Sequence, residues 1–164
     1  MKAYFTAAVA LLFLNSCVFE APFESEAKIP VEGKLLGRWE QVKDNPGESP
    51  DRMLVLQNAA NEYVVEYPVG EKAMYFRAYG VELEGANYIQ IQLIGTAEGP
   101  AKPEDRKYHL LKISVDGDAL EMRTLNADLL GKNLKDSTAM KAAFKAHKAD
   151  ADLFQEPSKF KRVK

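Results

Sequence analysis

Cysteine and histidine are scarce in this chain of 164 residues, and their scarcity limits its chemistry. With one cysteine, no disulfide can form within the chain, and the sequence contains only two histidines. A zinc site normally takes three or four histidine, cysteine or carboxylate ligands, so we expect no metal and no cofactor. The net charge of −2 gives no electrostatic reason to expect nucleic acid as a partner.

Long apolar runs are also lacking, except at the N-terminus. Residues 3–14 are almost wholly apolar and follow Lys2, which is the pattern of a signal-peptide core behind a positively charged start. The run is shorter than the roughly 20 residues that span a bilayer. Leu14, Asn15, Ser16 and Cys17 come directly after it.

These four residues resemble the lipobox of bacterial lipoproteins: an aliphatic residue, a tolerant position, a small residue and cysteine. The resemblance implies that residues 1–16 are removed as a signal peptide and that Cys17 carries the lipid that anchors the protein to a membrane. Cys17 is followed by Val18 and not by an aspartate, which in Gram-negative lipoproteins implies the outer membrane, facing the periplasm. A simple secretory signal with a chance cysteine is the alternative.

Residues 17–33 combine prolines with five charged side chains, a composition typical of an extended, solvated segment. We therefore expect a lipidated tether that lifts a domain, residues 34–164, off the membrane. Phe19 and Phe23 lie in this tether, and they either dip into the lipid interface or pack on the domain.

Short runs rich in β-branched and aromatic residues follow, separated by turn signals, and no long helical pattern interrupts them. This arrangement predicts a mainly β domain with an antiparallel meander. Gly80, inside one run, suggests a bend or bulge. The expected strands are 35–43, 52–57, 62–67, 72–83, 88–94, 106–115, 119–125 and 159–163.

A helix is expected late in the chain, from Ser137 to about His147, with Asp136 or Ser137 as its cap. Met140 and Phe144 lie four residues apart and share one face. We expect this helix to lie across the sheet or to plug one end of it, and the last strand to return beside the first.

The first strand begins with Gly37-Arg38-Trp39, and this motif, the meander and the late helix together resemble the lipocalins. The resemblance implies a closed β-barrel of about eight strands whose floor is sealed by Trp39, with an arginine packed across the indole ring. Arg162, on the last strand, is the candidate for that arginine, and Arg123 is the other. Such a barrel is either filled by side chains or holds one small ligand.

Candidate ligand-binding residues alternate on two neighbouring strands: Tyr75, Arg77, Tyr79, Gln90 and Gln92. They form either a polar lining that holds the head group of an amphipathic ligand or the solvated outer face of the barrel, and the sequence leaves both open. Tyrosine suits either place because its apolar ring carries a polar tip.

The two histidines do not predict an enzyme. His109 shares a strand face with Leu111 and Ile113, as a core or rim histidine with satisfied hydrogen bonds does, and His147 lies at the end of the helix, where a cation is favoured. We expect a non-enzymatic envelope lipoprotein that binds or carries a small apolar or amphipathic molecule. The alternative is a lipid-anchored module that binds another envelope protein and has no small ligand.

Overall fold

The computed structural model describes residues 19–45, 47–131 and 134–164, so that the expected signal peptide and Cys17 lie outside the described residues. The regular secondary structure of the described chain is mainly β, as predicted. The strands are β1 (Gly37–Gln41), β2 (Arg52–Ala59), β3 (Glu62–Glu66), β4 (Met74–Leu83), β5 (Ala86–Thr96), β6 (Gly99–Pro100), β7 (Tyr108–Asp116), β8 (Ala119–Thr124) and β9 (Ser158–Val163). The helical segments are η1 (Gly33–Leu35), η2 (Pro103–Asp105), α1 (Ala127–Leu130) and α2 (Ser137–His147).

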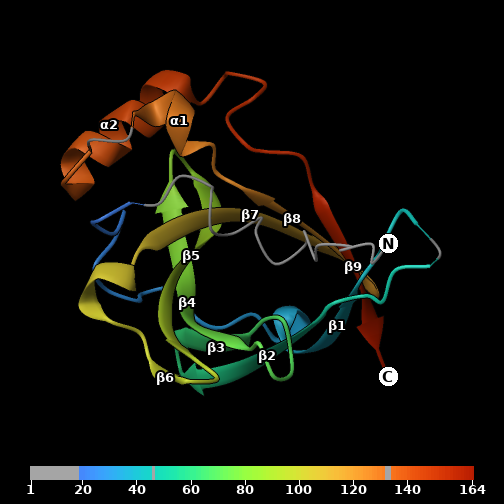
Figure 1. The fold of residues 1–164 in the computed structure, drawn as a ribbon. Helices are drawn as coiled ribbons and strands as arrows, with labels where there is room; N and C mark the ends of the chain where they lie inside the picture. Colours follow the sequence, from blue (N-terminus) through green and yellow to red (C-terminus); the bar gives the residue numbers. More distant parts are fainter. Residues whose placement is uncertain (1–18, 46, 132–133) are drawn as a thin grey trace, which may run out of the picture.

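Eight of these strands close into an antiparallel barrel within the described part of the chain, with neighbours in the order β1, β2, β3, β4, β5, β7, β8 and β9. The last strand closes the ring because β9 pairs with β8 on one side and with β1 on the other. The helices α1 and α2 come between β8 and β9 in the chain and lie outside the barrel wall (Figure 1). The predicted return of the last strand beside the first is confirmed.

Alternation along each strand divides the side chains between the inside and the outside of the barrel. Phe76 and Ala78 of β4 face inward together with Ile89 and Ile91 of β5, and they share an apolar interior with side chains from the other strands. Full burial of one such side chain stabilises the fold by about 1.5–3 kcal/mol. The interior is therefore the main hydrophobic core.

Gly80, where the sequence suggests a bend or a bulge, is not the site of a bulge. The irregularity in the β4–β5 ladder lies at Tyr75 and Phe76, which pair with Gly95 and Leu93. Gly80 instead lets another segment approach, since a Cβ atom at this position would lie 2.8 Å from the Cβ of Ile29. Real Cβ atoms do not come that close, so the position needs a glycine.

Residues 19–31 form a strap across the outside of the barrel. The sequence predicts an extended, solvated tether at these positions. Phe19 pairs with Tyr108 at one end of the strap, and Ile29 pairs with Gly80 farther along. Phe19 and Phe23 are 3% and 0% exposed. This described part of the segment is thus packed on the domain, which is the second of the two placements considered for the two phenylalanines.

A second hydrophobic core lies between the strap, the outer wall of the barrel and the helices. Met140 and Phe144 of α2 pack there with Phe23 of the strap and Leu110 of β7. Asp136 caps α2 by accepting a hydrogen bond of 2.8 Å from the Ala139 amide. The helix therefore lies across the sheet rather than plugging an end. In the described ranges, no helix has the length and apolar character needed to cross a bilayer.

Candidate functional site at the open end of the barrel

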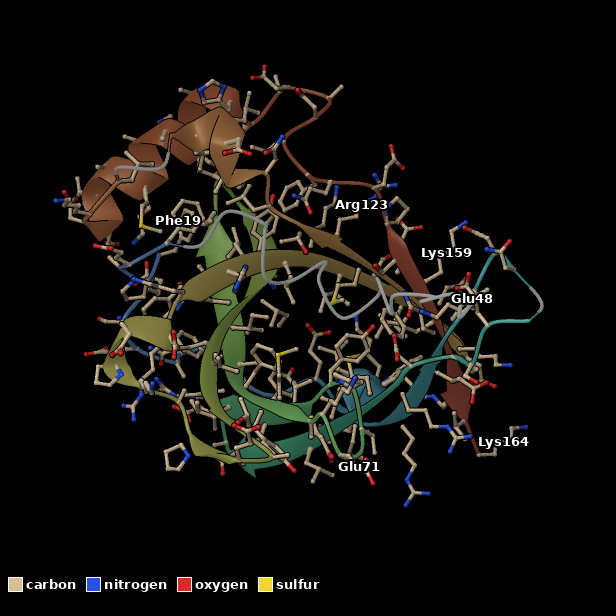
Figure 2. The ribbon with its side chains drawn as sticks, in the orientation of Figure 1. Phe19, Glu48, Glu71, Arg123, Lys159 and Lys164 are labelled. Carbon is tan, nitrogen blue, oxygen red and sulfur yellow. The ribbon has the colours of Figure 1, made fainter. Side chains whose placement is uncertain are left out.

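The two ends of the barrel differ. At one end of the barrel β1 begins and β9 ends, and η1 and Trp39 lie there. We call this end the closed end. The open end is the opposite one, formed by the connections that follow β1, β3, β5 and β8. Figure 2 labels Glu48 and Glu71, which belong to loops of the open end, and Lys164, which follows the last strand at the closed end.

Trp39 and Arg162 meet at the closed end. Trp39 is fully buried, and its Nε1 donates a hydrogen bond of 3.0 Å to the Leu35 carbonyl. The Arg162 guanidinium lies 4.2 Å from the centroid of the indole ring and donates to the carbonyls of Leu36 (2.8 Å) and Lys34 (2.7 Å). Arg162 thus covers the indole ring and binds the backbone segment that precedes β1.

Gly37 makes room for that arginine. Its φ angle is +117°, a conformation that L side chains rarely adopt, and a Cβ atom there would lie 3.1 Å from Nη1 of Arg162. Arg123, the other candidate, pairs with Glu121 at 3.0 Å on its own strand. The structure therefore brings together Gly37, Trp39 and Arg162 and leaves Arg123 apart from them.

The interior contains little free space. Its cavity measures about 50 Å³ and is lined by apolar residues such as Met53, Phe76 and Met122, with Tyr63 and Tyr67 among them. Pockets that enclose a drug-sized ligand measure roughly 300–1,000 Å³. The closed barrel therefore has no room for a complete amphipathic molecule.

A larger hollow lies at the open end. This rim groove, of about 780 Å³, has Met74, Phe76, Leu93 and Ala101 as its apolar floor. Its edge is charged, with Glu98, Lys102, Glu104, Asp105 and Lys107. Phe76 also lines the interior cavity, so its ring separates the groove from the inside of the barrel. An apolar floor with polar groups around it is the usual character of a small-molecule site.

His109 lines the same groove and is 7% exposed. Its Nδ1 is buried without a hydrogen-bond partner, and no other described buried side-chain nitrogen or oxygen atom is in that state. Burial lowers the pKa of His109 to about 4, because the charged imidazolium loses its hydration. The histidine is thus neutral at pH 7 and, contrary to the expectation of satisfied hydrogen bonds, retains hydrogen-bonding capacity.

A second groove, of about 790 Å³, lies on the other side of the open end and is more polar. Tyr67 and Met122 line both this groove and the interior cavity. The Tyr67 hydroxyl donates to Gln41 Oε1 at 3.4 Å. Burial, with Asp51 nearby, raises the pKa of Tyr67, so that it remains a neutral phenol at the edge of the barrel.

The five candidate ligand-binding residues do not line the cavity. Tyr79 and Gln90 point outward and lie beneath the strap, where both are buried. Gln90 accepts from the Phe23 amide (2.6 Å) and donates to the Glu24 carbonyl (3.0 Å), while the Tyr79 hydroxyl donates to the same carbonyl at 2.6 Å. These two residues therefore bind the strap rather than a ligand.

The other three candidates share the outer face. Arg77 forms an ion pair with Glu62, its guanidinium lies 4.8 Å from the Tyr79 ring centroid, and Gln92 donates to the Arg106 carbonyl at 3.2 Å. Tyr75 is adjacent to Phe76 on β4 and therefore also points outward. All five residues therefore lie on the outer face, which is one of the two placements that the sequence leaves open. Phe76 and Ala78 occupy the inward positions of β4.

The second histidine, His147, lies in an exposed pair away from the rim groove. His147 Nδ1 lies 2.7 Å from Asp150 Oδ2 at the exposed end of α2. Residues 19–45, 47–131 and 134–164 contain no group of three histidine, cysteine, aspartate or glutamate side chains able to hold a metal ion.

The comparisons with known proteins identify no relative of this chain. A scan against family models, a search of curated proteins and a search of solved structures each gave no match. The function has to be inferred from the chain itself.

The rim groove has no direct signal in the sequence. Its floor combines residues of β4 and β5 with Ala101, which lies in a connection between strands. The one available signal was the position of His109, which shares an inward-facing strand pattern with Leu111 and Ile113.

Proposed function

We propose that this protein is a non-enzymatic, lipocalin-like lipoprotein of the bacterial envelope that binds a small amphipathic molecule at the open end of its barrel. Lipid on Cys17 anchors it, in the outer membrane facing the periplasm if the cell is Gram-negative. The apolar part of the ligand lies on the floor of the rim groove, and its polar part lies at the charged edge.

One observation carries the proposal: beside its apolar floor, the rim groove is lined by a buried histidine that has an unpartnered nitrogen. A buried polar atom without a partner costs about 1–3 kcal/mol, so a ligand group or a water molecule that hydrogen-bonds to the imidazole recovers part of that cost. The small cavity behind Phe76 limits the ligand to the groove and to a shallow entry into the barrel.

The small interior supports a second candidate function. A barrel filled by its own side chains is a rigid module, and the protein would then act as a lipid-anchored binding partner for another envelope protein. This candidate predicts specific recovery of one envelope protein with the lipidated chain and no bound small molecule. A small ligand without a protein partner contradicts it.

Ligand binding is tested with a dansyl-labelled fatty acid and the mature chain carrying Cys17→Ser. Leu93→Gln places an amide in the apolar floor, and we expect it to weaken binding about tenfold, which corresponds to roughly 1.4 kcal/mol. Leu56→Gln is the matched control, because Leu56 is 48% exposed on β2 and does not line the groove. Unchanged circular dichroism shows that both variants are folded.

Equal affinities of the two variants, or no binding by the unsubstituted chain, contradict the proposed site. Anchoring is tested separately by growing cells with radiolabelled palmitate. The lipobox interpretation predicts label in the protein and none in the Cys17→Ser variant, and an unlabelled protein contradicts it.

A further inference from the structure

The strap fixes the position of the barrel relative to any lipid on Cys17. Phe19 and Tyr108 exchange two backbone hydrogen bonds, of 3.0 and 2.9 Å, and the Phe19 ring packs against Phe23 with centroids 5.4 Å apart. Only Val18 separates Phe19 from Cys17. Two residues of extended chain reach about 7 Å, so a lipid on Cys17 holds the bilayer surface close to Phe19.

Phe19 lies at the open end. Its partner Tyr108 is the first residue of β7, and the residues on either side of Tyr108, Lys107 and His109, both line the rim groove. From there the strap runs toward the closed end, where the Val31 amide donates to the Ala60 carbonyl at 3.0 Å. The point of attachment is thus next to the groove and far from the closed end.

Exposed apolar side chains occur at the same end of the barrel. Four large hydrophobic residues are exposed in the described part of the chain, and three of them belong to the open end: Val42, Val69 and Ile94. Val42 follows β1, Val69 lies between β3 and β4, and Ile94 is near the end of β5. They come from different sides of the barrel. A surface that contacts all three residues therefore lies directly across the open end.

We infer that the open end of the barrel rests on the bilayer, with the rim groove facing the lipid and exchanging its ligand with it. This inference rests on the proposed lipid anchor. The partner is the lipid surface itself, and the ligand class is an amphipathic component of that membrane. The loop of residues 102–107 carries three basic and two acidic side chains, so neither strongly anionic lipid nor low salt is required.

The orientation is measured with the full lipidated chain in vesicles of phosphatidylcholine and phosphatidylglycerol that contain a nitroxide-headgroup lipid. Because lipid occupies the sulfur of Cys17, one introduced cysteine is the only free thiol and takes a fluorophore. Lys102→Cys and Val69→Cys label two sides of the open end, and Asp116→Cys labels the end of β7 near the closed end. β4 alone has ten residues, a length of about 30 Å, so the two ends are distinguishable.

We expect the labels at positions 102 and 69 to lose most of their fluorescence and the label at 116 to keep it, at low and at high salt. Insertion of a flexible segment of about 20 residues between Val18 and Phe19, which adds a mean span of roughly 25 Å, should weaken the quenching at both open-end positions. Quenching at 102 without quenching at 69 means that the barrel lies on its side, and it overturns the inference, as does equal quenching at all three positions.

The outcomes separate this inference from the proposed function. Failure of the protein to remain on vesicles removes the anchor and overturns both. Equal quenching in a protein that binds the dansyl fatty acid overturns the orientation alone. Quenching at 102 and 69 in a protein that binds no amphipathic molecule supports the membrane-facing surface and contradicts ligand binding.

Discussion

The Arg162 guanidinium lies 4.2 Å from the centroid of the Trp39 ring and at the same time donates hydrogen bonds to the carbonyls of Lys34 and Leu36. Arg162 is on the last strand and Trp39 is on the first. One side chain thus connects the strand that closes the barrel, the strand that opens it, and the segment that leads into it.

Arg162→Ala should destabilise the protein by about 2–3 kcal/mol. A cation over an aromatic face contributes about 0.5–2 kcal/mol, and hydrogen bonds from a charged donor add about 1.5–3 kcal/mol, reduced here because the side chain is 25% exposed. Urea unfolding followed by Trp39 fluorescence measures the loss. Arg123→Ala removes only an outer-face pair with Glu121 and should change stability by less than about 1 kcal/mol. Equal effects of the two substitutions contradict the role of Arg162.

Gly37→Ala should cost about 1–3 kcal/mol, because a non-glycine residue is strained at a positive φ and because its Cβ would meet Nη1 of Arg162 at 3.1 Å. Gly33→Ala is the matched control: nothing lies within 4 Å of the place that its Cβ would take, and a change within about 0.5 kcal/mol is expected. Thermal unfolding of both variants measures the difference, and a neutral Gly37→Ala contradicts the role given to this glycine.

The strands were predictable because most of them bury only one face. Ile89 and Ile91 alternate with polar residues along β5, and this period of two identifies both the strand and its inward side. On β4 the alternation is ambiguous, since Phe76 and Ala78 face the interior while Tyr79 and Val81 face the second core. The sequence has no local signal for that outer cover, so it does not decide which face of β4 points into the barrel.

The path of the strap was not predictable for a related reason, although packing of Phe19 and Phe23 on the domain was one of the two placements expected. Its prolines and charges are typical of a solvated segment, yet Phe23 is fully buried, and its neighbour Glu24 forms an ion pair with Lys141. These contacts join residues that lie far apart in the chain, so local composition does not encode them. The groove at the open end depends on long-range contacts of the same kind.

Gln90→Ala should destabilise the protein by about 1–3 kcal/mol, because the Phe23 amide and the Glu24 carbonyl each lose a buried partner. Gln92→Ala on the same strand removes a single bond to the Arg106 carbonyl and should cost no more than about 0.5 kcal/mol. Urea unfolding compares the two. If Gln92→Ala is as damaging as Gln90→Ala, the strap is not held as described.

His109 should make the free energy of unfolding depend on pH. This dependence extends to pH values above those at which carboxylates titrate. Its folded pKa of about 4 lies below the ordinary value of 6.5, so the unfolded chain binds more protons and stability falls as the pH falls from about 6.5 toward 4. Between pH 7 and pH 5 the expected loss is about 2 kcal/mol. His109→Leu should remove this loss, and His147→Gln, at the exposed end of α2, should keep it. A His109→Leu variant with the same pH dependence contradicts the burial of a neutral imidazole.

Native mass spectrometry of the protein recovered from the envelope, with and without Leu93→Gln, shows whether the rim groove is a binding site. If the groove binds an amphipathic molecule, the unsubstituted protein carries a small adduct beyond the lipid on Cys17, and the Leu93→Gln protein carries much less of it. An unsubstituted protein whose mass is that of the lipidated chain alone contradicts ligand binding at the open end.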